Sequence, residues 1–154
     1  MKILFVCTGN TCRSPMAEAI FNKLNNNLDH SAYSAGISVI DEDFTTKNSS
    51  IVIMEKIGQD ISKRKAVFLT EELLQKYDLI LTMTLSHKLY IVQHYTDLSN
   101  NVYTLNEYVG IEKDILDPFG GNLSIYIETF KNLEESISLL LKKLEKDNSV
   151  TKKS

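Results

Sequence analysis

The start of the chain constrains the fold most strongly, because an apolar run is followed at once by a short loop and a helix signal. Residues 3–6 form an unbroken apolar run of the length typical of a buried strand. Ser14 predicts a helix N-cap, and Pro15 suits the first turn of that helix. Residues 7–13 are therefore expected to form a tight loop between a buried strand and a helix N-terminus.

Such a loop is suited to bind an anion, because its backbone N–H groups point inward beside the positive end of the helix dipole. Cys7 begins the loop, and the positive field there favours its nucleophilic thiolate form. Arg13 ends the loop, and its planar guanidinium can hold two oxygens of a phosphate or sulfate group. The loop thus predicts cysteine-based chemistry on a phosphoryl group.

Size and composition indicate one domain that needs no metal or disulfide. The chain has 154 residues, of which 43% are hydrophobic, so it can bury a core. A net charge of -3 argues against a nucleic-acid partner. Both cysteines lie in the loop, which fits a reducing compartment. With no signal peptide and no run of about 18 apolar residues, we expect a monomeric cytoplasmic protein without a membrane partner.

Strand and helix signals alternate along the chain, which predicts a parallel, doubly wound α/β sheet. Ligands of such sheets bind at the carboxyl ends of the strands, where the Cys7 loop would lie. We expect one domain over residues 1–146 and a disordered, Lys-rich tail over 147–154. Strands are expected at 3–6, 30–37, 77–83 and 101–105, and helices at 15–28, 45–57, from residue 70 onward, at 86–95 and at 124–146.

The segment from Phe5 to Glu18 (FVCTGNTCRSPMAE) resembles the low-molecular-weight protein tyrosine phosphatase family, and most of all its bacterial protein arginine phosphatase branch. A match of this length directly after a first strand is far more specific than a bare Cys-x5-Arg pattern. The resemblance implies a three-layer fold, with four parallel strands and helices on both faces. It also implies phosphoprotein substrates, a phosphocysteine intermediate, and no cofactor or metal.

The resemblance assigns catalytic roles to three residues. Cys7 is implied to be the nucleophile, Arg13 to bind the phosphoryl oxygens, and Asp117 to be the general acid. Taken alone, the pair Asp117-Pro118 indicates only a turn, but it lies just before the last helix, as the family's acid does. Phe119 is then an aromatic wall of the pocket or a loop residue packed on the core. The residues implied to bind phosphate are Thr8, Gly9, Asn10, Thr11, Cys12, Arg13 and Ser14.

Three polar residues are candidates to support the loop. Asn10 resembles the family's left-handed loop asparagine. Ser14 resembles the serine that donates a hydrogen bond to the thiolate, although a helix cap is an alternative or additional role. Ser34 resembles a serine of the supporting network, or has a structural role alone. Arg64 stands where many family members have a network histidine, so this departure leaves the network open.

Thr11 is the candidate for substrate selectivity. Tyrosine-selective members usually carry a bulky aliphatic residue there, whereas arginine-selective members carry Thr, as this chain does. A hydroxyl can accept from a guanidinium N–H, which an aliphatic side chain would leave unpaired at a cost of about 1–3 kcal/mol. The sequence therefore favours phosphoarginine hydrolysis. Phosphotyrosine hydrolysis remains the alternative, because some bacterial relatives with Thr are named tyrosine phosphatases.

Two minor alternatives are weaker. A thioredoxin-coupled arsenate reductase needs cysteines outside the loop, and this chain has none. A non-catalytic phosphate-binding module would be expected to lose Cys7, Arg13 or Asp117, and all three are present.

Three other features have open roles. Cys12 either forms a protective disulfide with Cys7 under peroxide or is a small buried loop residue. The acidic residues 41–43 are expected near the pocket rim, where they would attract basic substrates. The three histidines are distant from every motif and are expected at or near the surface; they are His30, His87 and His94.

Overall fold

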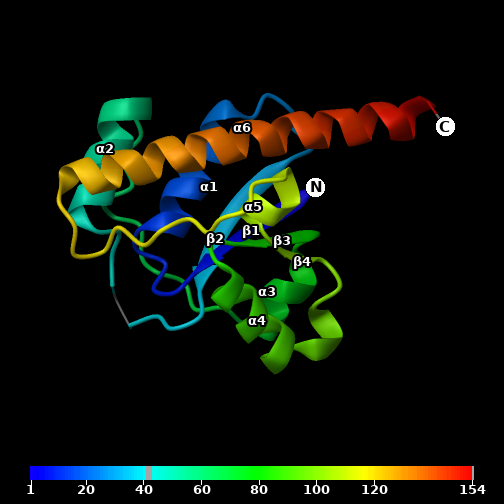
Figure 1. The fold of residues 1–154 in the computed structure, drawn as a ribbon, viewed down its shortest axis with the longest axis horizontal. Helices are drawn as coiled ribbons and strands as arrows, with labels where there is room; N and C mark the ends of the chain where they lie inside the picture. The colour runs from blue at the N-terminus through cyan, green and yellow to red at the C-terminus, as the bar shows by residue number, and fades with distance from the viewer. Residues whose placement is uncertain (41–42, 154) are drawn as a thin grey trace.

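Four parallel strands form a single sheet in the order β2-β1-β3-β4 (Figure 1). The computed structural model describes residues 1–40 and 43–153, with side chains described as far as Asp147. The order and direction of the strands confirm the expected doubly wound sheet. The strands are β1 (Lys2–Cys7), β2 (Ser31–Gly36), β3 (Leu79–Thr82) and β4 (Val102–Thr104).

Helices cover both faces of the sheet and complete three layers (Figure 1). One face is covered by α1 (Arg13–Leu24), α2 (Lys47–Ile57) and α6 (Leu123–Lys153), and the short α5 (Leu105–Val109) packs with them. The other face is covered by α3 (Glu71–Lys76), α4 (Leu85–His94) and the 3-10 turn η1 (Thr96–Leu98).

The apolar run that opens the chain is buried from both sides because successive strand residues point to opposite faces. Ile3 and Phe5 pack in the core beneath α1 and α6, whereas Leu4 and Val6 pack in the core beneath α3 and α4. The central position of β1 therefore explains why its sequence is continuously apolar, and it places Cys7 at the carboxyl edge of the sheet.

The helix ends that differ most from the sequence prediction are the C-termini of α1 and α6. Helix α1 ends at Leu24 instead of residue 28, because Asn25 is extended (ψ 126°) and its amide donates to the carbonyls of Asn27 and His30. Helix α6 extends to Lys153, beyond the helix end expected at residue 146. No glycine or proline follows Lys146 in the sequence, so nothing interrupts the hydrogen bonds of the helix backbone.

Helix α5 was missed, since Leu105 was assigned to the preceding strand and residues 106–109 to a loop. It begins with a capping box, in which the hydroxyl of Thr104 accepts from the N–H of Glu107 and the Glu107 carboxylate accepts from the N–H of Thr104. Gly110 then ends the helix in the left-handed conformation (φ 85°). A helix this short carries too little apolar periodicity to be recognised.

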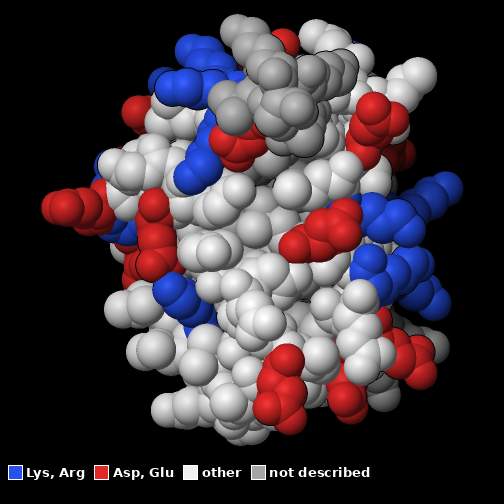
Figure 2. Space-filling model, turned by 90° about the vertical axis from the view of Figure 1, so that its right-hand side faces the viewer, with Lys and Arg blue, Asp and Glu red and all other residues white. Residues whose placement is uncertain are grey.

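The surface beside the N-terminus and the far end of α6 carries mixed charge. Figure 2 shows Lys and Arg side chains interspersed with Asp and Glu among the described residues of this face. Within the described part of the chain, no helix is both long and apolar enough to cross a membrane.

Candidate active site

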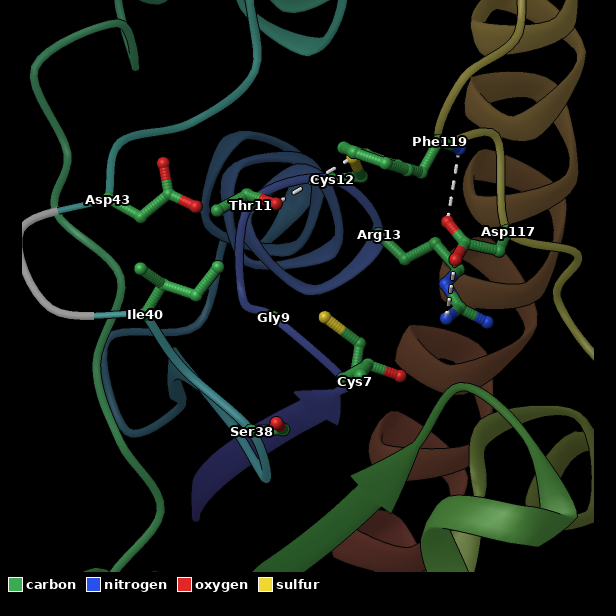
Figure 3. Close-up of a pocket in the computed structure, with 11 residues that line it drawn as sticks. Cys7, Gly9, Thr11, Cys12, Arg13, Ser38, Ile40, Asp43, Asp117 and Phe119 are labelled. Atoms are coloured by element: carbon green, nitrogen blue, oxygen red, sulfur yellow. Dashed lines mark hydrogen bonds and ion pairs between the residues drawn. The ribbon is translucent and has the colours of Figure 1, made fainter.

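The loop after β1 surrounds the thiol of Cys7, which lies at the base of a surface cavity (Figure 3). Cys7 is 3% exposed. The backbone N–H of Asn10 donates to its Sγ at 3.3 Å, and the Ser14 Oγ lies 2.8 Å from the same sulfur. The sulfur therefore has two polar neighbours from the loop and the first turn of α1.

The conformation of the loop depends on Asn10, which has the expected left-handed backbone (φ 56°) and is fully buried. Its amide Nδ2 donates to the Oγ atoms of Ser14 (2.7 Å) and Ser34 (3.0 Å). Its Oδ1 accepts from the backbone N–H of Val67 (2.9 Å) and from Nη1 of Arg64 (2.8 Å). Both ends of this buried amide are therefore satisfied by groups from other parts of the chain.

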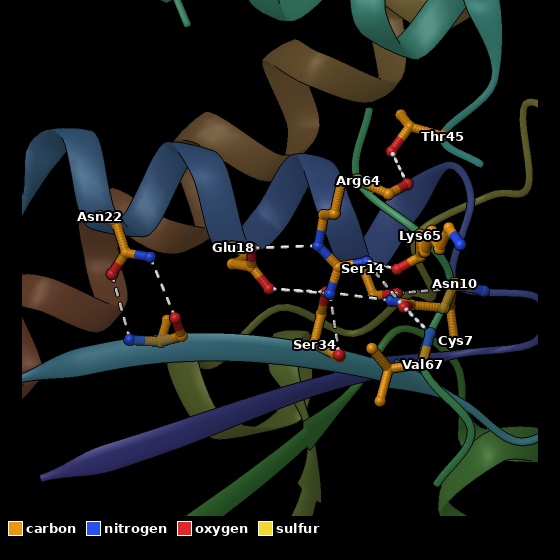
Figure 4. A network of polar contacts seen from close by, with 11 residues as sticks. Cys7, Asn10, Ser14, Glu18, Asn22, Ser34, Thr45, Arg64, Lys65 and Val67 are labelled. Carbon is orange, nitrogen blue, oxygen red and sulfur yellow. Dashed lines mark hydrogen bonds and ion pairs between the residues drawn. The ribbon is translucent and has the colours of Figure 1, made fainter. Parts of the chain in front are cut away.

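Arg64 occupies the centre of the supporting network (Figure 4). Its guanidinium donates to both carboxylate oxygens of Glu18, at 3.2 Å and 3.1 Å, and to the Oγ of Ser34 at 2.7 Å. The Ser34 hydroxyl in turn donates to Glu18 at 2.9 Å. The fork of the guanidinium thus reaches Glu18, Ser34 and Asn10 at once, so the departure from histidine leaves the network connected.

Ser14 does not cap α1, in contrast to the sequence prediction. The helix begins two residues earlier than expected, at Arg13 instead of Pro15, and no side chain caps it at Cys12. Ser14 is therefore inside the first turn, and its hydroxyl is directed at Cys7 and Asn10.

Arg13 connects the loop to the segment that carries Asp117. The buried guanidinium donates from Nη1 to the carbonyl of Ile115 at 2.9 Å, and its Nη2 lies 3.6 Å from Oδ2 of Asp117. The other carboxylate oxygen of Asp117 accepts from the N–H of Phe119 at 3.1 Å, which fixes the turn at Pro118. The side chain of Asp117 remains 52% exposed, so it is free to meet a substrate.

The cavity has a volume of about 220 Å³. Ile40 and Asp43 lie across it from Asp117 and Phe119 (Figure 3). Of the acidic segment, Asp43 lines the cavity, and residues 41–42 lie outside the described part of the chain. The lining residues are Cys7, Thr8, Gly9, Thr11, Cys12, Arg13, Ser38, Ile40, Asp43, Asp117 and Phe119.

Cys12 is a free thiol, as Cys7 is. Its sulfur lies 3.5 Å from the hydroxyls of both Thr46 and Tyr126. Burial and the contact with Cys12 raise the pKa of Tyr126 to about 12, so this hydroxyl stays protonated. Cys12 therefore lies in a pocket of hydroxyl groups between the loop, α2 and α6.

Two residues at the site were missed in the sequence. His87 was expected near the surface and away from every motif, yet it is buried and its Nε2 lies 2.8 Å from the Thr8 hydroxyl. Gly36 ends β2 beneath the loop, and a Cβ there would lie 2.6 Å from the Thr8 carbonyl oxygen and 2.9 Å from the Asn10 nitrogen. The Ser-Ala-Gly ending of β2 was a local signal for Gly36, whereas only the fold brings His87 to the loop.

Among the residues with described side chains, no group of three or more His, Cys, Asp and Glu is placed to hold a metal ion. The side chains around the cavity instead provide a thiol, a guanidinium and a carboxylate. Together with the N–H of Asn10, which points at the sulfur, this set can transfer a phosphoryl group to sulfur and then to water. Fold and site together define a cysteine-dependent protein phosphatase.

The chain belongs to the low-molecular-weight phosphatase family, because residues 2–150 match the family described as low molecular weight phosphotyrosine protein phosphatase. It is 42% identical to a protein-arginine-phosphatase of Bacillus subtilis, over 96% of this chain and 99% of that protein. It is also 45% identical to the low molecular weight protein-tyrosine-phosphatase PtpB of Staphylococcus haemolyticus, over 86% of this chain and 92% of that protein.

The fold has a solved counterpart in an arginine phosphatase, YwlE, in a cysteine-to-serine mutant with a phosphorylated active site serine. The two chains superpose with a TM-score of 0.89 at 41% identity, over 96% of this chain and 97% of the other.

Proposed function

We propose that this phosphatase hydrolyses phosphoarginine on proteins. The observation that carries the proposal is Thr11, whose side chain lines the cavity where tyrosine-selective relatives place an aliphatic group. Its hydroxyl is available to accept a hydrogen bond from a guanidinium N–H. The likeness to the Bacillus subtilis protein-arginine-phosphatase supports the same substrate.

In the proposed first step, the Cys7 thiolate forms a bond to phosphorus as the P–N bond breaks, and Asp117 gives its proton to the leaving nitrogen. The loop N–H groups and Arg13 stabilise the charge on the equatorial oxygens. Asp117 then takes a proton from water, the water oxygen bonds to phosphorus, and the S–P bond breaks. Inorganic phosphate is released, Cys7 returns to its thiolate form and Asp117 to its protonated form, and no metal takes part.

The other loop residues are proposed to bind and support the phosphoryl group. The backbone of residues 8–14 supplies the N–H donors, and the Asn10 and Ser14 contacts hold the thiol in place. Ser34 acts through Asn10 and Arg64. Phe119 is proposed to form one wall of the selectivity pocket.

A second candidate function is phosphotyrosine hydrolysis. It is favoured by the similarity to PtpB of Staphylococcus haemolyticus and by the exposed ring of Phe119, which could pack on the ring of phosphotyrosine. Paired peptides separate the two candidates, with phosphoarginine and phosphotyrosine in the same flanking sequence.

The test measures kcat/KM on both peptides for the parent, Thr11→Ile and Thr11→Ser. We expect the parent and the Ser variant to prefer phosphoarginine, and the Ile variant to lose or reverse that preference by about tenfold or more. A parent that prefers phosphotyrosine would make Thr11 irrelevant to selectivity. Activity on neither peptide would instead favour the arsenate reductase or the non-catalytic alternative.

Cys12 is proposed to protect Cys7 by forming a reversible disulfide under peroxide. A matched Cys12→Ser variant tests this by the activity recovered after peroxide and then a thiol reductant. Recovery equal to that of the parent would leave Cys12 as a buried loop residue among hydroxyl groups.

We infer further that the enzyme works as a monomer in the cytoplasm, on phosphoproteins and without nucleic-acid or membrane partners. The net charge of -3 and the presence of only two cysteines, both in the loop, support this setting. Light scattering of the purified chain tests the monomer, and fractionation of cells tests the location.

A further inference from the structure

The proposed mechanism leaves one buried titratable side chain beside the loop without a role. His87 lies in the first turn of α4, where its N–H donates to the Thr84 hydroxyl at 3.2 Å. Its imidazole is 4% exposed and faces the phosphate loop instead of solvent.

The two nitrogens of this imidazole have different surroundings. Nε2 lies 2.8 Å from Oγ1 of Thr8, the first residue after Cys7. Nδ1 is buried and has no hydrogen-bond partner among the described residues. The ring therefore makes a single side-chain hydrogen bond within the described part of the chain, and that bond is to the loop.

The orphaned Nδ1 indicates which nitrogen carries the proton. A buried N–H without a partner is rarer and costlier in proteins than a buried acceptor without one. The neutral tautomer with its proton on Nε2 avoids that cost. Burial, together with the nearby Arg13 guanidinium, lowers the pKa of His87 to about 4, so the ring is neutral in the physiological range.

In this tautomer His87 donates to Thr8, so the Thr8 oxygen acts as the acceptor and its own hydroxyl proton is directed elsewhere. Among the described residues, that hydroxyl has no other hydrogen bond than the one to His87. Thr8 also lines the cavity above Cys7, where a phosphoryl group would bring acceptor oxygens.

We propose that the Thr8 hydroxyl donates a hydrogen bond to a phosphoryl oxygen in the cavity, and that His87 is the positioning residue that orients this hydroxyl. The phosphoryl group would then receive a side-chain donor in addition to the loop N–H groups and Arg13. This inference holds for either substrate, because both carry the same phosphoryl group.

The first test uses inorganic phosphate as the probe, so it does not depend on whether phosphoarginine is the substrate. Thr8→Val removes the hydroxyl at nearly constant shape, and Thr8→Ser keeps it. We expect the inhibition constant of phosphate to rise about tenfold in Thr8→Val, with little change in Thr8→Ser. Equal phosphate inhibition in the parent and Thr8→Val would overturn the proposal.

The second test separates positioning from a general structural role. His87→Phe should weaken phosphate inhibition several-fold in the parent and have almost no further effect in the Thr8→Val background. His94→Gln, at the other end of α4, serves as the matched control. If the effects of His87→Phe and Thr8→Val on the inhibition constant of phosphate multiply in the double variant, His87 does not act through Thr8 and its positioning role is overturned. If His87→Phe does not fold, His87→Gln replaces it, because its amide can still donate to Thr8, and it should retain phosphate inhibition close to that of the parent.

Discussion

The floor of the cavity (residues 7–14) and its rim (Ile40, Asp43, Asp117 and Phe119) are built in opposite ways. Asn10 and Ser14 of the floor are fully buried and hydrogen-bonded, whereas Ile40 and Phe119 of the rim are 73% and 71% exposed. The floor faces the phosphoryl group, which every substrate shares. The rim faces the group to which the phosphoryl is attached. We therefore expect substitutions in the floor, apart from the selectivity residue Thr11, to affect all substrates, and those at Ile40, Asp43 and Phe119 of the rim to discriminate among them.

Cys7→Ser tests the floor and has the largest expected effect. Turnover of both peptides should fall by about 10⁴-fold or more, because a hydroxyl is a far weaker nucleophile than a thiolate. Steady-state rates measure the loss, and phosphate binding by calorimetry shows that the variant is folded. If turnover falls for only one of the two peptides, the floor does not act on all substrates alike and the distinction between floor and rim is wrong.

Asp117→Asn tests the catalytic part of the rim. We expect kcat to fall about 10²–10³-fold, since the amide cannot protonate the leaving group. Inhibition by phosphate should persist because the floor is unchanged. Glu112→Gln, an exposed carboxylate earlier in the same segment, is the control and should keep the parent's kcat.

His87, beside the floor, makes the free energy of unfolding of the protein depend on pH. Its pKa is about 4 in the folded protein and about 6.5 when unfolded, so only the unfolded chain takes up its proton between these values. The free energy of unfolding should therefore fall as pH drops from 6.5 towards 4, by on the order of 3 kcal/mol. Denaturant titrations at several pH values should show this loss in the parent and in His94→Gln but not in His87→Phe. The same dependence of the unfolding free energy on pH in all three proteins would contradict the prediction.

The nearby charges act on His87 in both directions. Arg13 lowers its pKa further, whereas the carboxylates of Asp114 and Asp117 raise it. Asp117→Asn should therefore lower the pKa of His87 slightly further. The free energy of unfolding lost on acidification should increase slightly as a result, which links a rim residue to the stability of the protein.

Arg64→Ala tests the network beneath the floor. It leaves the Glu18 carboxylate without its main partner and removes one donor from Asn10, so we expect about 2 kcal/mol of destabilisation. Urea unfolding measures the loss, and the exposed Lys63→Ala is the control. An unchanged midpoint would show that Asn10 holds the loop without Arg64.

Asp43→Asn has the smallest expected effect and sharpens the description of the rim. Its carboxylate lines the cavity and is proposed to attract basic residues that flank the phosphorylated one. We expect KM to rise about threefold on peptides with basic flanks at low salt, and the difference to vanish at high salt. The exposed Glu135→Gln on α6 should not change KM.

The sequence was most informative where contacts are local. The loop, its strand and its helix lie within the first 24 residues, and each was recognised from neighbours in the chain. Asp117 could be singled out only through resemblance, because an Asp-Pro pair by itself indicates a turn. The position of Ser14 inside α1 was also missed, because capping rules put the start of that helix two residues too late.

Contacts between distant residues escaped sequence reasoning. Arg64 reaches Asn10 across 54 positions and His87 reaches Thr8 across 79, so only the sheet order brings each pair together. The length of α1 was also overestimated, because the amide of Asn25 forms its bonds to the loop carbonyls only once β2 is in place.

The hydrogen bond from Arg13 to the Ile115 carbonyl spans 102 positions of the chain. It holds the start of the segment that carries Asp117 directly against the phosphate loop, independently of the route the backbone takes between them. The N–H of Ile115 donates in turn to the carbonyl of Met83 at 3.0 Å. A single backbone residue thus ties the segment that carries Asp117 both to the phosphate loop and to the residue that follows β3.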